Sequence, residues 1–399
     1  MANKAGKMIS TASKIYLVSG YRTPFGKFGG SLMDLPPTEL ATIAAKALLS
    51  DLKLDPSTID HVLFANVLPV TPETFYAGRH LGLNIGCPEK IPAKVTNRLC
   101  GSGIDTILEA TRLIKLDEAS IVLVAGAENM SMAPHLIYGS RFGTKYGSLP
   151  TKDMLLDTLT DARIQTPMGI TAENLAEKYQ ISKSDSDEFS FQSHQKAAAA
   201  YAQNLIQGEI APVVLKRETL SQDQHMRTDA KRSDWDNLRP TFKKDGVVTA
   251  GSASGIVDGG AAMIIASEAA VKKYNLLPLA EIIDGYVVGV NPSEMGIGPV
   301  PVINKLLSKN KLTKDQIDLF EINEAFAAQA IACMKALELD ISKVNVWGGA
   351  TALGHPLGAT GLKITLTLAR ALKHYKKGYG ISSACIGGGQ GIGVLLKSI

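Results

Sequence analysis

The sequence predicts an α/β protein made of two similar halves, with a large insertion in the first half. Three observations lead to this prediction. Apolar segments of strand length alternate with helical segments along most of the 399 residues. The order of segments before residue 128 recurs, as a weak internal repeat, from about residue 275. Between the two, residues 129–247 are more polar and carry most of the long charged helical segments.

The first half begins with a buried strand and continues as alternating helices and strands. We predict strands at 15–18, 59–66 and 121–125, and helices at 38–49, 76–83 and from 100 onwards. These strands are apolar throughout, which is typical of a mostly parallel sheet covered by helices on both faces. In the second half we predict strands at 280–283, 317–323 and 380–385, and helices at 301–309 and 354–372.

The insertion divides the chain into three predicted units. They are an N-terminal half (residues 1–128 and 248–274), a loop or lid domain (129–247) and a C-terminal half (275–399). The second part of the insertion is basic. We expect most of these basic side chains to be solvated surface and a minority to bind phosphate.

Composition argues against several classes of protein. The formal net charge of +4 is small for this length and does not indicate a nucleic-acid partner. No apolar run is long enough to span a membrane. The four cysteines are far apart and form no CxxC pattern, which argues against a metal site or disulfide framework. The first 13 or so residues are expected to be a short disordered extension, although residues 1–33 lack Asp and Glu, as transit peptides do.

Cys100 lies in the stretch Asn97–Gly103, where an extended segment turns into a helix. Unpaired N–H groups at a helix start favour negative charge, and such a site lowers a thiol pKa from ~8.5. Gly101 and Gly103 leave space for a substrate beside the sulfur. Taken alone, however, a free cysteine is more often a small buried apolar residue.

Three further segments carry residue types that acid–base and acyl chemistry use. They are Asn323–Phe326, Gly354–Pro356 and Cys385–Gly389. Each alone has a structural interpretation, since Asn can cap a helix and His or Cys can be buried in a core. The glycines near the C-terminus are not a dinucleotide loop, because only six residues follow Gly393.

Together, in this order and spacing, the four segments resemble the thiolases over nearly the whole chain. Further matching motifs are Gly126–Ser131, Met168–Asn174 and Gly348–Gly361. Among thiolases the chain is most similar to degradative 3-ketoacyl-CoA thiolases of mitochondrial type. That similarity rests on residues 141–145, Pro167–Met168 and residues 383–391. The resemblance implies two α/β halves packed as α/β/α/β/α layers, with a loop-domain insertion.

The resemblance also implies roles for five residues. Cys100 attacks the acyl carbon and holds an acyl thioester, and His355 activates it. Cys385 exchanges protons with the α-carbon and the CoA thiol. Asn323, through a water, completes one oxyanion hole with His355. The backbone N–H groups of Cys100 and Gly387 make the other.

Coenzyme A, as a substrate rather than a permanently bound cofactor, is expected to lie along the insertion. The family pattern places Arg227 at its nucleotide end and Leu238 at its adenine. The residues that line the rest of the path are Phe242, Ala253, Ser254, Ala325 and Phe326, with Met168 and Met295 flanking the acyl pocket. The family pattern also implies a homodimer or homotetramer.

The favoured function is CoA-dependent cleavage of 3-ketoacyl-CoA to acetyl-CoA and a shortened acyl-CoA, as in fatty acid β-oxidation. One alternative is an acetoacetyl-CoA thiolase with the same residues and a smaller acyl pocket. Another is a non-catalytic CoA-ester-binding relative, which has no physical need for two thiols and an imidazole. Ketoacyl synthases use one Cys with two His, and the Cys385 segment argues against them. The expected location is bacterial cytoplasm, or the mitochondrial matrix in a eukaryote.

Overall fold

The computed structural model describes residues 14–399, and the predicted disordered extension lies outside them. One sheet of the N-terminal half has the strand order β4-β3-β5-β12-β1, with the short β2 paired to β12. Its strands are β1 (Ile15–Arg22), β2 (Gly26–Lys27), β3 (His61–Ala65), β4 (Ala93–Thr96), β5 (Ile121–Glu128) and β12 (Val257–Ser267). The predicted strands at 15–18, 59–66 and 121–125 are therefore present.

The C-terminal half repeats this order as β14-β15-β16-β13. These strands are β13 (Ala280–Gly289), β14 (Leu319–Ile322), β15 (Tyr379–Ile386) and β16 (Gln390–Ser398). A parallel bridge between Phe320 and Val344 stands where β4 pairs with β3 in the first half. The predicted internal repeat is thus confirmed in the pairing of the strands. The two sheets meet where β1 pairs with β13 over two residues, Tyr16 and Leu17.

The expectation of a mostly parallel sheet is wrong. Only β3–β4, β3–β5 and β14–β15 are parallel, while β12 and β16 run antiparallel to both of their neighbours. All eleven residues of β12 are buried. The apolar strands therefore correctly predicted burial on both faces, because helices cover both faces of these mixed sheets. The same pattern did not predict the direction of the strands.

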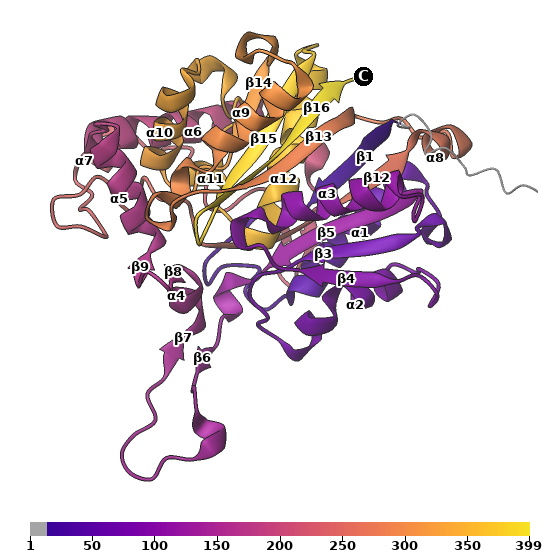
Figure 1. Cartoon of the computed structure of the whole chain (residues 1–399). Helices are drawn as coiled ribbons and strands as arrows, with labels where there is room; N and C mark the ends of the chain where they lie inside the picture. Colours follow the sequence, from indigo (N-terminus) through magenta and orange to yellow (C-terminus); the bar gives the residue numbers. More distant parts are fainter. Residues whose placement is uncertain (1–13) are drawn as a thin grey trace, which may run out of the picture.

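Two helices lie between the sheets and form the middle layer (Figure 1). They are α3 (Ser102–Lys115) and α12 (Leu357–His374). Their first turns touch backbone to backbone: a Cβ on Gly103 would lie 2.8 Å from the Leu362 nitrogen, and one on Gly361 would overlap the Ile104 nitrogen. Only glycine permits this approach.

Outer helices complete the α/β/α/β/α layers. On the N-terminal sheet these are α1 (Pro37–Leu52), α2 (Ala77–Asn84) and α8 (Glu268–Lys273). On the C-terminal sheet they are α9 (Pro299–Asn310) and α10 (Ala327–Leu337), with α11 (Ala350–Leu353) leading towards α12. Among the described residues, no helix is long and apolar enough to cross a membrane.

The segment between β5 and β12 holds short elements and two longer helices. An arm made of β6 (His135–Leu136) and β7 (Lys152–Asp153) extends away from the body (Figure 1). The other elements are α4 (Met154–Thr158), β8 (Thr160–Asp161), β9 (Thr166–Pro167), α5 (Met168–Lys178), α6 (Lys183–Ala202), β10 (Val213–Val214), β11 (Thr219–Leu220) and α7 (Ser233–Asp236). Helices α5 and α6 pack on α10 of the C-terminal half. The division into three units at 128, 248 and 275 stays a prediction.

A buried ion cluster ties this insertion to β1. Arg22 is fully buried and donates to Glu209 (2.7 Å) and to both carboxylate oxygens of Asp223 (2.7 and 2.9 Å). Tyr201 and Thr367 donate further hydrogen bonds to these carboxylates. The Arg22 guanidinium holds the pKa of Asp223 below its ordinary value.

Arg22→Met should therefore destabilise the fold by ~3–5 kcal/mol, because it leaves two buried carboxylates without a cation. Urea unfolding measures the change. Arg112→Met is the control, since Arg112 forms only an exposed pair with Glu109 and its loss should cost under ~1 kcal/mol. Equal midpoints for the two variants would contradict the structural importance of the cluster.

Candidate active site

Cys100 lies in a tight turn between β4 and α3, as the sequence predicts. The turn Leu99–Gly101 is a 3₁₀ helix, and Leu99 adopts a left-handed backbone conformation (φ +47°). Two side chains fix this turn. Asn97 Oδ1 accepts from the Leu99 N–H (2.9 Å), and Ser102 Oγ accepts from the Arg98 N–H and donates to the Leu99 carbonyl (both 2.7 Å). These bonds stabilise a backbone conformation that leucine rarely adopts.

The thiol of Cys100 is not the low-pKa group that its helix-start position predicts. Burial raises its pKa to about 11, and the negative charge of Glu128 adds to the rise. The backbone N–H groups of Gly387 and of Cys100 itself face the sulfur and lower the pKa, by less. Desolvation of the thiolate thus exceeds the helix-start effect, and the resting group is a thiol.

His355 is held as a neutral imidazole in one tautomer. Its Nδ1 lies 2.6 Å from Thr360 Oγ1, whose own proton goes to the Pro356 carbonyl (3.1 Å). Nδ1 must then carry the ring proton, and Nε2 is left as an acceptor. Burial lowers the His355 pKa to about 4, so Nε2 carries no proton at neutral pH.

Asn323 stands directly after β14 and faces His355. Its Nδ2 lies 3.3 Å from His355 Nε2, and its backbone N–H donates to the Ser383 carbonyl on β15. Its side-chain oxygen is buried and has no hydrogen-bond partner among residues 14–399. A buried amide oxygen without a donor is costly, so this atom marks a position for a water or a substrate donor.

Cys385 is fully buried on β15, in a cluster with Met295, Ala325 and Phe326. Burial raises the pKa of its thiol well above the ordinary value, and the nearby thiols of Cys100 and Cys333 add to the rise. The turn after it needs glycine, because Gly388 and Gly389 have φ values of +81° and +84°.

One cavity of about 290 Å³ collects most of the predicted site. Both Cys100 and His355 line it, so the two helix starts meet at one place. Seven predicted substrate residues also line it: Met168, Phe242, Ala253, Ser254, Met295, Ala325 and Phe326. The remaining wall is mainly apolar and includes Met130, Leu156, Leu159, Pro167, Ile256 and Leu357.

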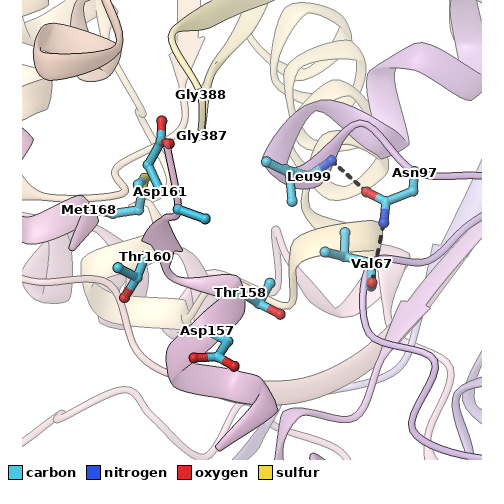
Figure 2. Close-up of a pocket in the computed structure, with 11 residues that line it drawn as sticks. Val67, Asn97, Leu99, Asp157, Thr158, Thr160, Asp161, Met168, Gly387 and Gly388 are labelled. Atoms are coloured by element: carbon cyan, nitrogen blue, oxygen red, sulfur yellow. Dashed lines mark hydrogen bonds between the residues drawn. The ribbon is translucent and has the colours of Figure 1, made fainter. Parts of the chain in front are cut away.

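Two predicted coenzyme A residues lie outside this cavity. Arg227 is exposed in the insertion, and Leu238 packs close to Gly251. Gly387 lines a second cavity of about 330 Å³ on the other side of Met168 (Figure 2). Figure 2 shows Asp157, Thr158, Thr160 and Asp161 on one wall of this cavity and Asn97 and Leu99 opposite.

Sequence reasoning missed two residues that support the site. Thr360 fixes the tautomer of His355. It lies five residues after His355, in the first turn of α12, and this spacing could have indicated the contact. Glu128 is fully buried at the end of β5 and accepts from the N–H groups of Leu68 and Gly358 (2.8 and 2.9 Å). It therefore ties the loop after β3 to the start of α12. No group of His, Cys, Asp and Glu among the described residues is arranged to hold a metal ion.

The high pKa of Cys100 predicts how this thiol reacts in the free protein. Because the thiolate is the nucleophile, alkylation of Cys100 by iodoacetamide should rise about tenfold per pH unit from pH 7 to 10 without a plateau. Mass spectrometry of the Cys100 peptide measures the rate. Cys100→Ser supplies the background from the three buried cysteines. A plateau below pH 8 would contradict the buried-thiol description.

Comparison with known proteins identifies the family of this chain. Residues 15–269 match the family described as "Thiolase, N-terminal domain", and residues 276–398 match "Thiolase, C-terminal domain". The human protein named "3-ketoacyl-CoA thiolase, mitochondrial" is 47% identical over 389 residues, which cover 96% of this chain and 98% of the relative. "Beta-ketothiolase BktB" of Cupriavidus necator is 41% identical, over 97% of this chain and 99% of the relative.

Solved structures give the same result. The crystal structure of human mitochondrial 3-ketoacyl-CoA thiolase in complex with CoA has a TM-score of 0.95 at 48% identity, covering 97% of this chain and 98% of that chain. The Bacillus anthracis acetyl-CoA acetyltransferase has a TM-score of 0.94 at 36% identity, covering 97% and 99%. The resemblance predicted from the sequence is confirmed, and the chain belongs to the thiolase family.

Proposed function

We propose that this protein is a 3-ketoacyl-CoA thiolase, which cleaves a 3-ketoacyl-CoA with coenzyme A into acetyl-CoA and a shortened acyl-CoA. One observation carries the proposal: Cys100 and His355 line the same apolar cavity, with Asn323 and Cys385 directly behind it. The human relative that is 47% identical to this chain is named a 3-ketoacyl-CoA thiolase, which supports the proposal. The chemistry is that of an acetyl-CoA acyltransferase in fatty acid β-oxidation.

Acylation begins when His355 Nε2 takes the proton of the Cys100 thiol. The sulfur then attacks the 3-keto carbon of the substrate, and the bond between C2 and C3 breaks. The N–H groups of Cys100 and Gly387 stabilise the oxyanion of the tetrahedral intermediate. Both groups are neutral at rest, so this proton transfer is what makes the sulfur nucleophilic.

The leaving group is the enolate of acetyl-CoA, which needs a proton at C2. Cys385 is the donor in this mechanism, and Asn323 with His355 stabilises the enolate oxygen through a bound water. The Cys385 thiolate then takes the proton of the incoming coenzyme A thiol, and that sulfur attacks the acyl thioester on Cys100. Acyl-CoA leaves, His355 returns its proton to the Cys100 sulfur, and both cysteines are again thiols.

Coenzyme A enters along the wall that the insertion contributes. Ala253, Ser254 and Phe242 border the pantetheine path, and the Phe242 ring lies edge-on to Phe326 at 6.1 Å. Arg227 and Leu238 would meet the nucleotide, since they lie outside the cavity on the same insertion. The related human structure is described as a complex with CoA, which supports CoA as the ligand.

Partners and location are inferred with the function. We infer a homodimer or homotetramer, because β4 is a sheet edge and the β6–β7 arm exposes large aromatic side chains such as Phe142 and Tyr146. The location stays either bacterial cytoplasm or the mitochondrial matrix, since relatives named above come from a human mitochondrion and from bacteria.

Incubation with acetyl-CoA should place an acetyl group on Cys100. Intact mass followed by peptide mapping measures the adduct. Cys100→Ala should carry no adduct and should lose thiolysis by orders of magnitude, because no other thiol faces the cavity wall beside His355. An acetyl group on Cys385 would contradict the assignment.

Cys385→Ser is the matched variant for this experiment. It should still acquire acetyl at Cys100, although more slowly, because His355 activates that thiol and the coenzyme A thiolate can leave without the proton that Cys385 supplies. Condensation and exchange of the α-protons should fall about 10²–10⁴-fold, as for loss of an acid–base group. A near wild-type condensation rate would exclude the proposed role of Cys385.

Substrate length follows from the apolar cavity wall. Pro167 lies next to Met168 in that wall, where acetoacetyl-CoA thiolases usually carry His. Each buried methylene contributes ~0.8 kcal/mol, so kcat/KM for thiolysis should rise from the C4 to the C8 and C10 substrates. A maximum at C4 would instead identify an acetoacetyl-CoA thiolase. Pro167→His should reduce the C8 preference if this residue shapes the pocket.

A further inference from the structure

Two imidazoles, one buried and one partly buried, lie in the insertion behind the wall of the catalytic cavity. His194 on α6 is 2% exposed, and its ring is 5.5 Å from Trp235 and 6.3 Å from His225. The His225 ring presses on Gly255, where a Cβ would lie 2.6 Å from it. None of these three side chains lines the catalytic cavity or takes part in the proposed acyl chemistry.

His194 makes one hydrogen bond that fixes its chemical state. The backbone N–H of Arg227 donates to His194 Nδ1 at 3.1 Å. A backbone N–H can only donate, so Nδ1 carries no proton and the ring is neutral with its proton on Nε2. Burial, together with the neighbouring His225 and Arg227, lowers the His194 pKa to about 3. The acceptor therefore persists throughout the pH range in which the enzyme is assayed.

This hydrogen bond joins α6 to the backbone of Arg227 itself, within a segment that α6 also contacts through Tyr201 and Glu188. The same segment is fixed upstream, where Asp223 pairs with Arg22 and Tyr201. On the other side, Trp235 Nε1 donates to the Gly251 carbonyl (3.0 Å), just before Ala253 and Ser254. The Gly255 carbonyl in turn accepts from the His355 N–H (2.9 Å). The position of Arg227 relative to the catalytic loop thus depends on this chain of contacts.

We infer that His194 is a positioning residue, whose Nδ1 holds the Arg227 backbone where it meets the nucleotide end of coenzyme A. The inference rests on the proposed function. The inference goes beyond the proposed function because it assigns two separate roles to the side chain at position 194. Packing against Trp235 requires only an apolar side chain of similar size, whereas holding Arg227 requires an acceptor atom attached to Cγ. Loss of the acceptor should weaken binding of the nucleotide and leave acyl transfer intact.

The test compares two substitutions and two thiols. His194→Leu keeps the volume and removes the acceptor, while His194→Asn places an oxygen on Cγ where Nδ1 stood. His374→Leu is the control, because His374 also packs on aromatic rings, Trp347 and Tyr375, but makes no hydrogen bond to the Arg227 segment within residues 14–399. Thiolysis is measured with coenzyme A and with pantetheine, which lacks the nucleotide, at saturating 3-ketooctanoyl-CoA because that substrate carries the same nucleotide. Calorimetry measures coenzyme A binding.

His194→Leu should raise KM and Kd for coenzyme A three- to tenfold, with kcat and the pantetheine reaction within twofold of wild type. His194→Asn should restore most of the affinity. Equal losses with both thiols, or unchanged coenzyme A affinity in His194→Leu, would overturn the inference. Failure of the proposed function is distinguishable, because the wild-type protein would then cleave the substrate with neither thiol.

Discussion

The contact between the first turns of α3 and α12 is the constraint on which the site depends. Two helices rarely approach backbone to backbone, and here Gly103 and Gly361 make it possible. Since each helix comes from a different half, this contact brings Cys100 and His355 to one cavity. Gly126 and Gly358 continue the close packing towards β5, and Glu128 ties the same region together with hydrogen bonds.

A second feature follows from the depth of this contact. Groups that meet between two sheets are desolvated, so the thiols and the imidazole are all neutral at rest. Their reactivity then comes from placement and from oriented hydrogen bonds rather than from preformed ions. Thr360 and Asn323 provide that orientation for His355, one on each ring nitrogen. The backbone N–H groups of Cys100 and Gly387 lower the pKa of the Cys100 sulfur by less than burial raises it.

The insertion adds the substrate-binding wall to a core that the two repeats already complete. Its link to β1 is the cluster around Arg22, and its link to the catalytic loop runs through Trp235 and Gly251. Buried polar contacts of this kind require specific partners, which makes the position of the insertion well defined. A surface segment such as the one carrying Arg227 can then hold a ligand while its base stays rigid.

The sequence alone predicted correctly the α/β class, the internal repeat, most strand and helix positions and membership of the thiolase family. It could do so because apolar periodicity and glycine-rich helix starts are local signals. Strand direction was decided only by the tertiary structure, since a strand buried on both faces has the same composition in parallel and antiparallel sheets. The raised pKa of Cys100 also depends on the tertiary structure, because desolvation is caused by every group packed around the sulfur. The contributions of Glu128 and His194 could be found only in the structure, because hydrogen bonds between separate segments leave no local sequence pattern.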